Sequence, residues 1–131
     1  MSISVTPFLM FEGQAEEAMN FYAEAIPGSE IVSLERYPAG GGGPEGTVYQ
    51  ATMNLAGQSV RFFDSPVSHG FTFTPAVSFF ITCQEQAEFD QIVSGLGESG
   101  QFLMPPDNYG FSQKYAWLND RFGVSWQISL P

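Results

Sequence analysis

Among the residues of this sequence that are able to do chemistry, one arginine stands out. Arg61 is one of only four Lys and Arg residues in 131, against 14 acidic residues. It falls in the segment 59–63, where the alternation of an extended chain places it on the face opposite Val60 and Phe62. An enclosed arginine needs a partner, because an unpaired buried charge is costly. Two interpretations remain open: Arg61 anchors an anionic or carbonyl-bearing ligand, or it pairs with Glu35.

Polar residues on neighbouring segments are expected to share a face with Arg61. The extended segments 47–55 and 124–130 each alternate an apolar face with one that is polar but nearly uncharged. In 47–55 the apolar face is expected to hold Tyr49, Ala51, Met53 and Leu55. Gln, Ser, Thr and Asn suit a partly enclosed cavity, although a solvated face of a charge-poor protein is the alternative. The residues expected to line the cavity are Tyr37, Gln50, Arg61, Phe63 and Gln127.

Other reactive side chains are few. His69 lies in a loop rich in Ser and Thr and is interpreted as a surface residue. A single cysteine, Cys83, excludes an internal disulfide and is interpreted as a buried thiol, although a nearby helix N-terminus would lower its pKa. The run Gly40–Gly43 lies between two expected strands and predicts a flexible loop rather than a phosphate cradle. Asp120–Gly123 has the residues of a hairpin turn.

Composition limits the partners. The formal net charge of -10 argues against nucleic acid and anionic membranes, because both are bound through Lys and Arg. A hydrophobic fraction of 44% and an aromatic fraction of 15% exclude intrinsic disorder. No apolar run approaches the roughly 20 residues of a membrane helix, and the N-terminus lacks the features of a signal peptide. We therefore expect a cytoplasmic protein with a small-molecule partner.

Two copies of one structural unit are expected to position these residues. The order strand, helix, strand, strand, strand is predicted over about 1–66 and again over about 75–131. The helices are expected near 14–26 and 85–97, where apolar residues recur at i, i+3, i+4 and i+7. The sequence thus predicts an α+β fold, with a single domain over 1–131 built from two tandem βαβββ modules.

Four segments together resemble the PhnB-like proteins of the vicinal-oxygen-chelate superfamily, which includes glyoxalases, bleomycin-resistance proteins and dioxygenases. The segments are TPFLMFEGQAEEAMNFY, EGTVYQATMNLAGQ, SFFITCQEQAEFD and WLNDRFGVSWQISLP. The resemblance implies that two βαβββ modules curl their mixed sheets into a cup around a ligand or metal. Members of the superfamily commonly pair, and the high apolar content also points to an interface. We therefore expect a homodimer with two-fold symmetry.

The resemblance also raises the question of a cofactor, because PhnB-like proteins are often labelled demethylubiquinone methyltransferase-like. S-adenosylmethionine is not expected here, since the element order gives antiparallel strand triplets and no glycine-rich turn before a helix. In metal-using superfamily members the ligands come from the first and last strands of each module. The matching positions are Pro7, Arg61 and Gln127, and the strand 76–82 has no His, Asp or Glu. Since amide oxygens such as that of Gln50 bind transition metals weakly, neither a metal nor a cofactor is expected.

The function predicted from the sequence is that of a PhnB-like small-molecule binding protein with a cup-shaped site and no catalytic metal. The identity of the ligand stays open. One alternative is an enzyme of unassigned reaction, for example a lyase, an isomerase or a dioxygenase-like enzyme, in the same cup. Another is a module for assembly or partner interaction.

Overall fold

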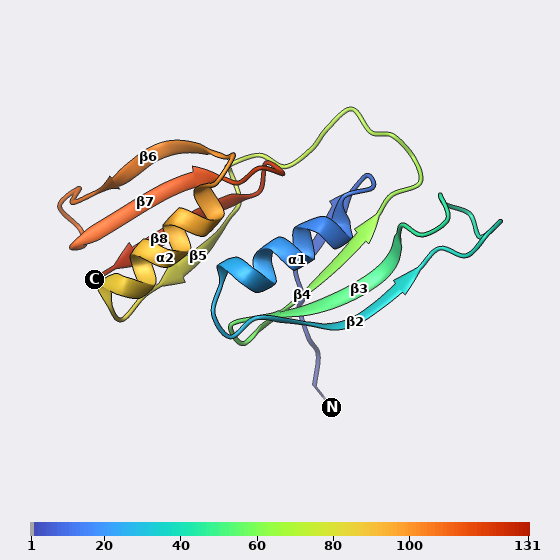
Figure 1. The fold of residues 1–131 in the computed structure, drawn as a ribbon, viewed down its shortest axis with the longest axis horizontal. Helices are drawn as coiled ribbons and strands as arrows, with labels where there is room; N and C mark the ends of the chain where they lie inside the picture. Colours follow the sequence, from blue (N-terminus) through green and yellow to red (C-terminus); the bar gives the residue numbers. More distant parts are fainter. Residues whose placement is uncertain (1) are drawn as a thin grey trace. The chain divides into compact units, whose positions relative to one another are not determined.

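The computed structural model describes residues 2–131 and contains two units with the same order of elements (Figure 1). The first unit ends at His69 and the second spans Gly70–Pro131. Each unit packs one helix on one face of a four-stranded mixed sheet, so the predicted α+β fold of two βαβββ modules is confirmed. Within the described residues, neither helix has the length and apolar character needed to pass through a bilayer.

The first unit builds its sheet in the order β1-β4-β3-β2. Its elements are β1 (Phe8–Phe11), α1 (Ala15–Ala25), β2 (Glu30–Arg36), β3 (Val48–Leu55) and β4 (Gln58–Asp64). β1 runs parallel to β4, while the other neighbours are antiparallel. The apolar stripe of α1 is buried against the sheet, as the helical spacing predicts. The opposite face of the sheet, which no helix of the unit covers, is called the open face below.

The second unit repeats this arrangement in the order β5-β8-β7-β6. Its elements are β5 (Ser78–Thr82), α2 (Gln86–Gly97), β6 (Gln101–Asp107), β7 (Lys114–Asn119) and β8 (Ser125–Leu130). β5 is parallel to β8, and β6 is an edge strand that continues through Pro105 and Pro106. Proline is tolerated at such an edge because no neighbouring strand needs its missing N–H. The apolar stripe of α2 is again buried.

A β-bulge changes which side chains of β3 are buried. The register passes from Glu35 opposite Gln50 to Arg36 opposite Val48, which makes Tyr49 an extra residue in β3. Val48 is fully buried and Tyr49 is 53% exposed, the reverse of what uninterrupted alternation predicts. The expectation of an apolar face that includes Tyr49 is therefore wrong at this end of the strand. Beyond the bulge the predicted buried residues are confirmed: Ala51, Met53 and Leu55.

Asp64, at the end of β4, joins three parts of the first unit. Its Oδ1 accepts hydrogen bonds from the backbone N–H groups of Gly13 (2.8 Å) and Ala15 (3.0 Å), and its Oδ2 accepts one from Val48 (2.8 Å). The carboxylate thus satisfies amides at the start of α1 that have no partner within the helix. It also holds the bulged end of β3 against β4.

Asp120 has a similar task in the turn between β7 and β8. Its carboxylate accepts hydrogen bonds from the backbone N–H groups of Phe122 and Val124 and from Nε1 of Trp126. The backbone N–H of Gly123 donates to the Asp120 carbonyl at 2.9 Å, which confirms the predicted hairpin turn. Because Asp120 is only 3% exposed, these bonds replace the water that its charge loses on folding.

Candidate functional site

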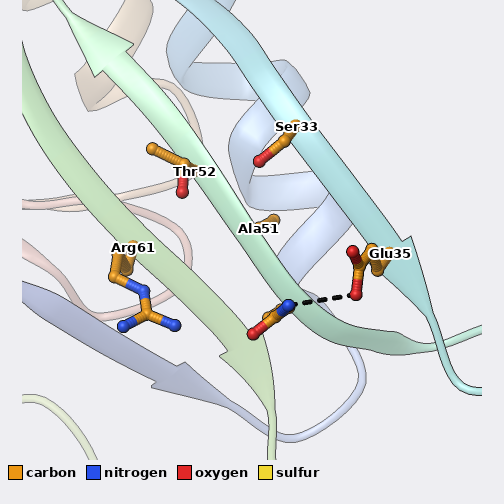
Figure 2. A pocket seen from close by; sticks show the side chains of 6 residues that line it. Ser33, Glu35, Ala51, Thr52 and Arg61 are labelled. Atoms are coloured by element: carbon orange, nitrogen blue, oxygen red, sulfur yellow. Dashed lines mark hydrogen bonds between the residues drawn. The ribbon is translucent and has the colours of Figure 1, made fainter.

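A pocket of about 180 Å³ lies on the open face of the first unit (Figure 2). Three adjacent strands supply its lining. Their side chains meet there because directly opposed residues of an antiparallel pair point to the same side of a sheet. Thr52 lies opposite Ser33 on one side and opposite Arg61 on the other, and Glu35 lies opposite Gln50. The full lining is Ser33 and Glu35 from β2, Gln50, Ala51 and Thr52 from β3, and Arg61 from β4.

Arg61 is exposed rather than enclosed, and it presents its guanidinium group to this pocket without a carboxylate partner. Its guanidinium carbon lies 5.1 Å from the centre of the Phe8 ring, a residue of the adjacent strand β1. Within residues 2–131 no carboxylate oxygen comes within 4.0 Å of it, whereas the other three Lys and Arg side chains all form ion pairs. Those pairs are Arg36–Glu16, Lys114–Asp90 and Arg121–Glu98.

Glu35 supplies the opposite charge in the pocket. Its Oε2 accepts a hydrogen bond of 3.0 Å from Nε2 of Gln50, the residue across from it in β3. Figure 2 shows this bond as a dashed line, with Arg61 on β4, the strand on the other side of β3 from Glu35. The ion pair between Arg61 and Glu35 that the sequence left as an alternative is absent from the described residues, although both side chains line one pocket.

The structure brings some of the predicted site residues together. Gln50 and Arg61 line the pocket. Phe63 lies two residues beyond Arg61 on the same face of β4, and its ring stacks on Phe8 with 4.9 Å between ring centres. These aromatic rings give the polar pocket an apolar border on the β1 side.

Tyr37 does not line this pocket. It follows the end of β2, is 7% exposed, and its hydroxyl donates a hydrogen bond of 3.0 Å to the backbone carbonyl of Asp64. Gly43 lies against its ring so closely that a Cβ there would be 2.8 Å from ring atoms. The expectation that Tyr37 lines the same surface as Gln50 is therefore corrected, because the tyrosine is packed at the end of the sheet.

Gln127 belongs to the second unit, where it is part of a chain of hydrogen bonds across the open face. Its Oε1 accepts from the Tyr115 hydroxyl at 2.5 Å, and its Nε2 donates to Oγ of Ser78 at 3.2 Å. Ser78 is bonded in turn to Oγ of Ser125 (2.6 Å), which accepts from Nε1 of Trp117. The amide that was expected to contact a ligand is thus engaged within its own unit. Burial, with a smaller effect of Tyr109, raises the pKa of Tyr115.

Ser33 is a pocket residue that the sequence analysis missed. From Glu35 opposite Gln50 the register is regular back to Ser33 opposite Thr52, and the irregularity of β2 lies between Ile31 and Ser33. Alternation along β2 does indicate this position, because Ser33 lies two residues before Glu35 on the same face. Thr52 itself belongs to the polar side of 47–55, as the alternation around Gln50 indicates.

The remaining reactive residues lie outside the pocket. His69 is half-buried, with its Nε2 3.0 Å from Oγ of Ser65. Cys83 is 3% exposed, and burial, followed by the nearby Glu88, raises the pKa of its thiol. A pKa lowered by the following helix, the alternative for Cys83, is therefore wrong.

The family is decided by the comparison with known proteins. A sequence model described as 3-demethylubiquinone-9 3-methyltransferase matches residues 3–129. The chain belongs to this family of PhnB-like proteins. A solved structure titled "Putative 3-demethylubiquinone-9 3-methyltransferase, PhnB protein", from Bacillus cereus, is 52% identical to this PhnB-like chain. It covers 98% of this chain and 100% of its own, with a TM-score of 0.95.

Two more distant proteins also match this PhnB-like chain. Protein YjdN of Escherichia coli is 21% identical over 140 residues, covering 96% of this chain and 94% of its own. The fosfomycin resistance protein FosX of Mesorhizobium loti is 10% identical, covers 98% of this chain and 91% of its own, and matches with a TM-score of 0.64. At that level of identity the likeness to FosX concerns the fold alone.

The residues of this PhnB-like chain do not fit a divalent metal. Among residues 2–131 no three His, Cys, Asp or Glu side chains gather closely enough to hold an ion. At two of the positions where the sequence analysis sought metal ligands, Arg61 would repel a cation, and Pro7 has no side-chain donor atom.

S-adenosylmethionine does not fit the glycine run either. Gly40–Gly43 is followed by β3 rather than by a helix, and Gly41 and Gly43 are packed against Pro38 and Tyr37. The backbone of this run therefore lacks the helix N-terminus at which nucleotide-type cofactors are held.

Proposed function

We propose that this PhnB-like protein binds a small organic molecule in the pocket of the first unit and anchors it through Arg61. The observation that carries the proposal is the guanidinium group of Arg61, which faces a pocket without a carboxylate partner while every other Lys and Arg side chain in residues 2–131 has one. A planar guanidinium matches the two oxygens of a carboxylate or of paired carbonyl groups.

The surroundings of Arg61 support a ligand with both polar and apolar parts. Gln50 offers an amide carbonyl oxygen as an acceptor, in addition to the N–H that it donates to Glu35. The stacked rings of Phe8 and Phe63 border the same face and offer apolar contact. This mixture of a few polar groups beside aromatic surface is typical of small-molecule sites.

The proposal is for a binding protein that uses neither a catalytic metal nor S-adenosylmethionine. It departs from the methyltransferase description of the family model and from the metal sites of other superfamily members. Two features support this. The polar side chains around the pocket are one cation, three amide or hydroxyl groups and one carboxylate, and the glycine run precedes a strand rather than a helix.

The test is a screen of small carboxylic acids and neutral analogues against wild-type protein and Arg61→Met, by thermal shift and then by calorimetry. We expect the substitution to weaken acidic ligands by about 1.5–3 kcal/mol, the scale of hydrogen bonds to charged groups. Neutral ligands and the melting temperature should change little, because Arg61 has no carboxylate partner to lose. Arg121→Met, in the second unit, is the control. If Arg61→Met binds every acid found with the same affinity as the wild-type protein, the proposal is refuted.

A further inference from the structure

Two opposite charges face the same pocket without contacting each other. From this arrangement we infer that the ligand is a zwitterion, whose anionic group lies at Arg61 and whose cationic group lies at Glu35. The inference rests on the proposed function and adds the charge pattern of the ligand to it. Its basis is that both side chains line the pocket, while no ion pair joins them within the described part of the chain.

The sheet itself keeps the two charges apart. Arg61 is in β4 and Glu35 in β2, with β3 between them. Adjacent strands lie about 4.8 Å apart, so the two Cα atoms are separated by roughly 10 Å or more. Phe8 lies against the guanidinium on one side, and Gln50 holds the carboxylate on the other. A ligand that contacts both groups therefore needs several bonds between its own charges.

The central row of the pocket offers hydrogen bonds between the two charges. Ser33, Thr52 and Arg61 follow one another across three strands, because Thr52 is opposite both of its neighbours. Neither hydroxyl group of this row has a hydrogen-bond partner within residues 2–131. The Gln50 carbonyl oxygen is likewise unengaged in that part of the chain. The middle of a ligand thus meets donors and acceptors rather than an apolar surface.

Electrostatics also favours a zwitterion over a simple anion. A net charge of -10 repels anions at long range, and Glu35 repels a second carboxylate inside the pocket. Arg61 in turn repels a diamine. A neutral molecule with separated charges avoids the long-range repulsion and satisfies both groups at short range. Glu35 thus disfavours ligands that carry only negative charge, and Arg61 disfavours ligands that carry only positive charge. Such repulsion of the wrong ligand is a recognised source of specificity.

The probes are ω-amino acids of increasing length: glycine, 4-aminobutanoate, 5-aminopentanoate and 6-aminohexanoate. Each is compared with its N-acetyl derivative, which keeps the carboxylate and loses the cation. Dissociation constants are measured by NMR titration, following the Arg61 Nε–H and Gln50 side-chain signals. We expect the longer amino acids to bind at least about tenfold more tightly than both glycine and their own N-acetyl derivatives.

Variants separate the two charges. In Glu35→Gln the tenfold advantage of the free amino group should vanish, while the N-acetyl derivatives bind as before or slightly better. Glu30→Gln removes an exposed carboxylate from the same strand outside the pocket and should keep the advantage. In Arg61→Met both series should weaken. Circular dichroism of each variant verifies that it is folded.

The outcomes distinguish the inference from the function it rests on. If carboxylic acids bind through Arg61 but the free amino group brings no advantage, or if Glu35→Gln leaves that advantage intact, the zwitterion is refuted and the acid-binding function stands. If no acid and no amino acid of any length binds, both are refuted. Equal affinity for glycine and for the longer chains refutes the separation of charges that the strand spacing predicts.

Discussion

Among single residues, Asp64 contacts three backbone amides that lie far apart in the sequence. Replacing it by Asn keeps the shape but presents NH₂ to N–H groups that need an acceptor. We expect Asp64→Asn to lower the free energy of unfolding by about 2–3 kcal/mol, because a buried amide is left without its bond. Urea denaturation measures the loss. Glu24→Gln, an exposed isosteric change on α1, should be neutral, and a similar value for both variants would contradict the role of Asp64.

Cys83 makes a prediction about pH. Burial and Glu88 raise the pKa of its thiol in the folded protein, so the unfolded chain loses the proton first as the pH rises. The contribution of the Cys83 thiol to the free energy of unfolding is therefore complete below about pH 9. It is lost as the pH rises from there toward the raised pKa of the folded protein. Urea unfolding at about pH 8 and about pH 10 should therefore show a larger loss of stability in wild type than in Cys83→Ala. An equal loss in both would contradict a raised pKa.

At the scale of elements, the segment between β2 and β3 is more closely packed than a flexible flap. Gly43 contacts the Tyr37 ring, and a Cβ there would lie 2.8 Å from three ring atoms. We expect Gly43→Ala to lower the free energy of unfolding by about 1–3 kcal/mol, the usual cost of overpacking. Gly70→Ala is the matched control, because a Cβ at Gly70 meets nothing within 4 Å. Equal midpoints of thermal unfolding would show that Tyr37 moves aside at no cost.

The elements also show where the sequence was informative. The apolar spacing predicted both helices to within about two residues, because one buried stripe per helix leaves a strong periodic signal. The polar side of β3 was predictable from Gln50 to the end of the strand, because buried and polar residues alternate regularly there. The two irregularities in the β2–β3 register leave no such signal, since one extra residue inverts the alternation without changing composition. Tyr37 was misplaced beyond the second of these points, whereas Ser33 is in regular register with Glu35 and could have been predicted by alternation.

At the scale of the whole molecule, the predicted homodimer remains to be tested. Large apolar side chains are exposed on the chain, among them Ile3 (91%), Val5 (88%) and Val77 (80%), and exposed apolar surface often marks an interface. We expect sedimentation at micromolar concentration to give twice the 14.4 kDa of the chain. Because each copy has a net charge of -10, added salt should tighten the association by screening the repulsion. A single 14 kDa species at all salt concentrations would contradict the dimer.

The open faces of the two units differ in how fully their polar groups are bonded, and this has an evolutionary consequence. On the second unit, Tyr115, Gln127, Ser78, Ser125 and Trp117 bond to one another, so a mutation at any of them removes a contact of the fold. On the first unit, a mutation at Ser33 or Thr52 removes no such bond. For the binding site proposed on the first repeat, we therefore expect single mutations to change ligand preference at little cost in stability, whereas mutations on the open face of the second repeat should cost stability.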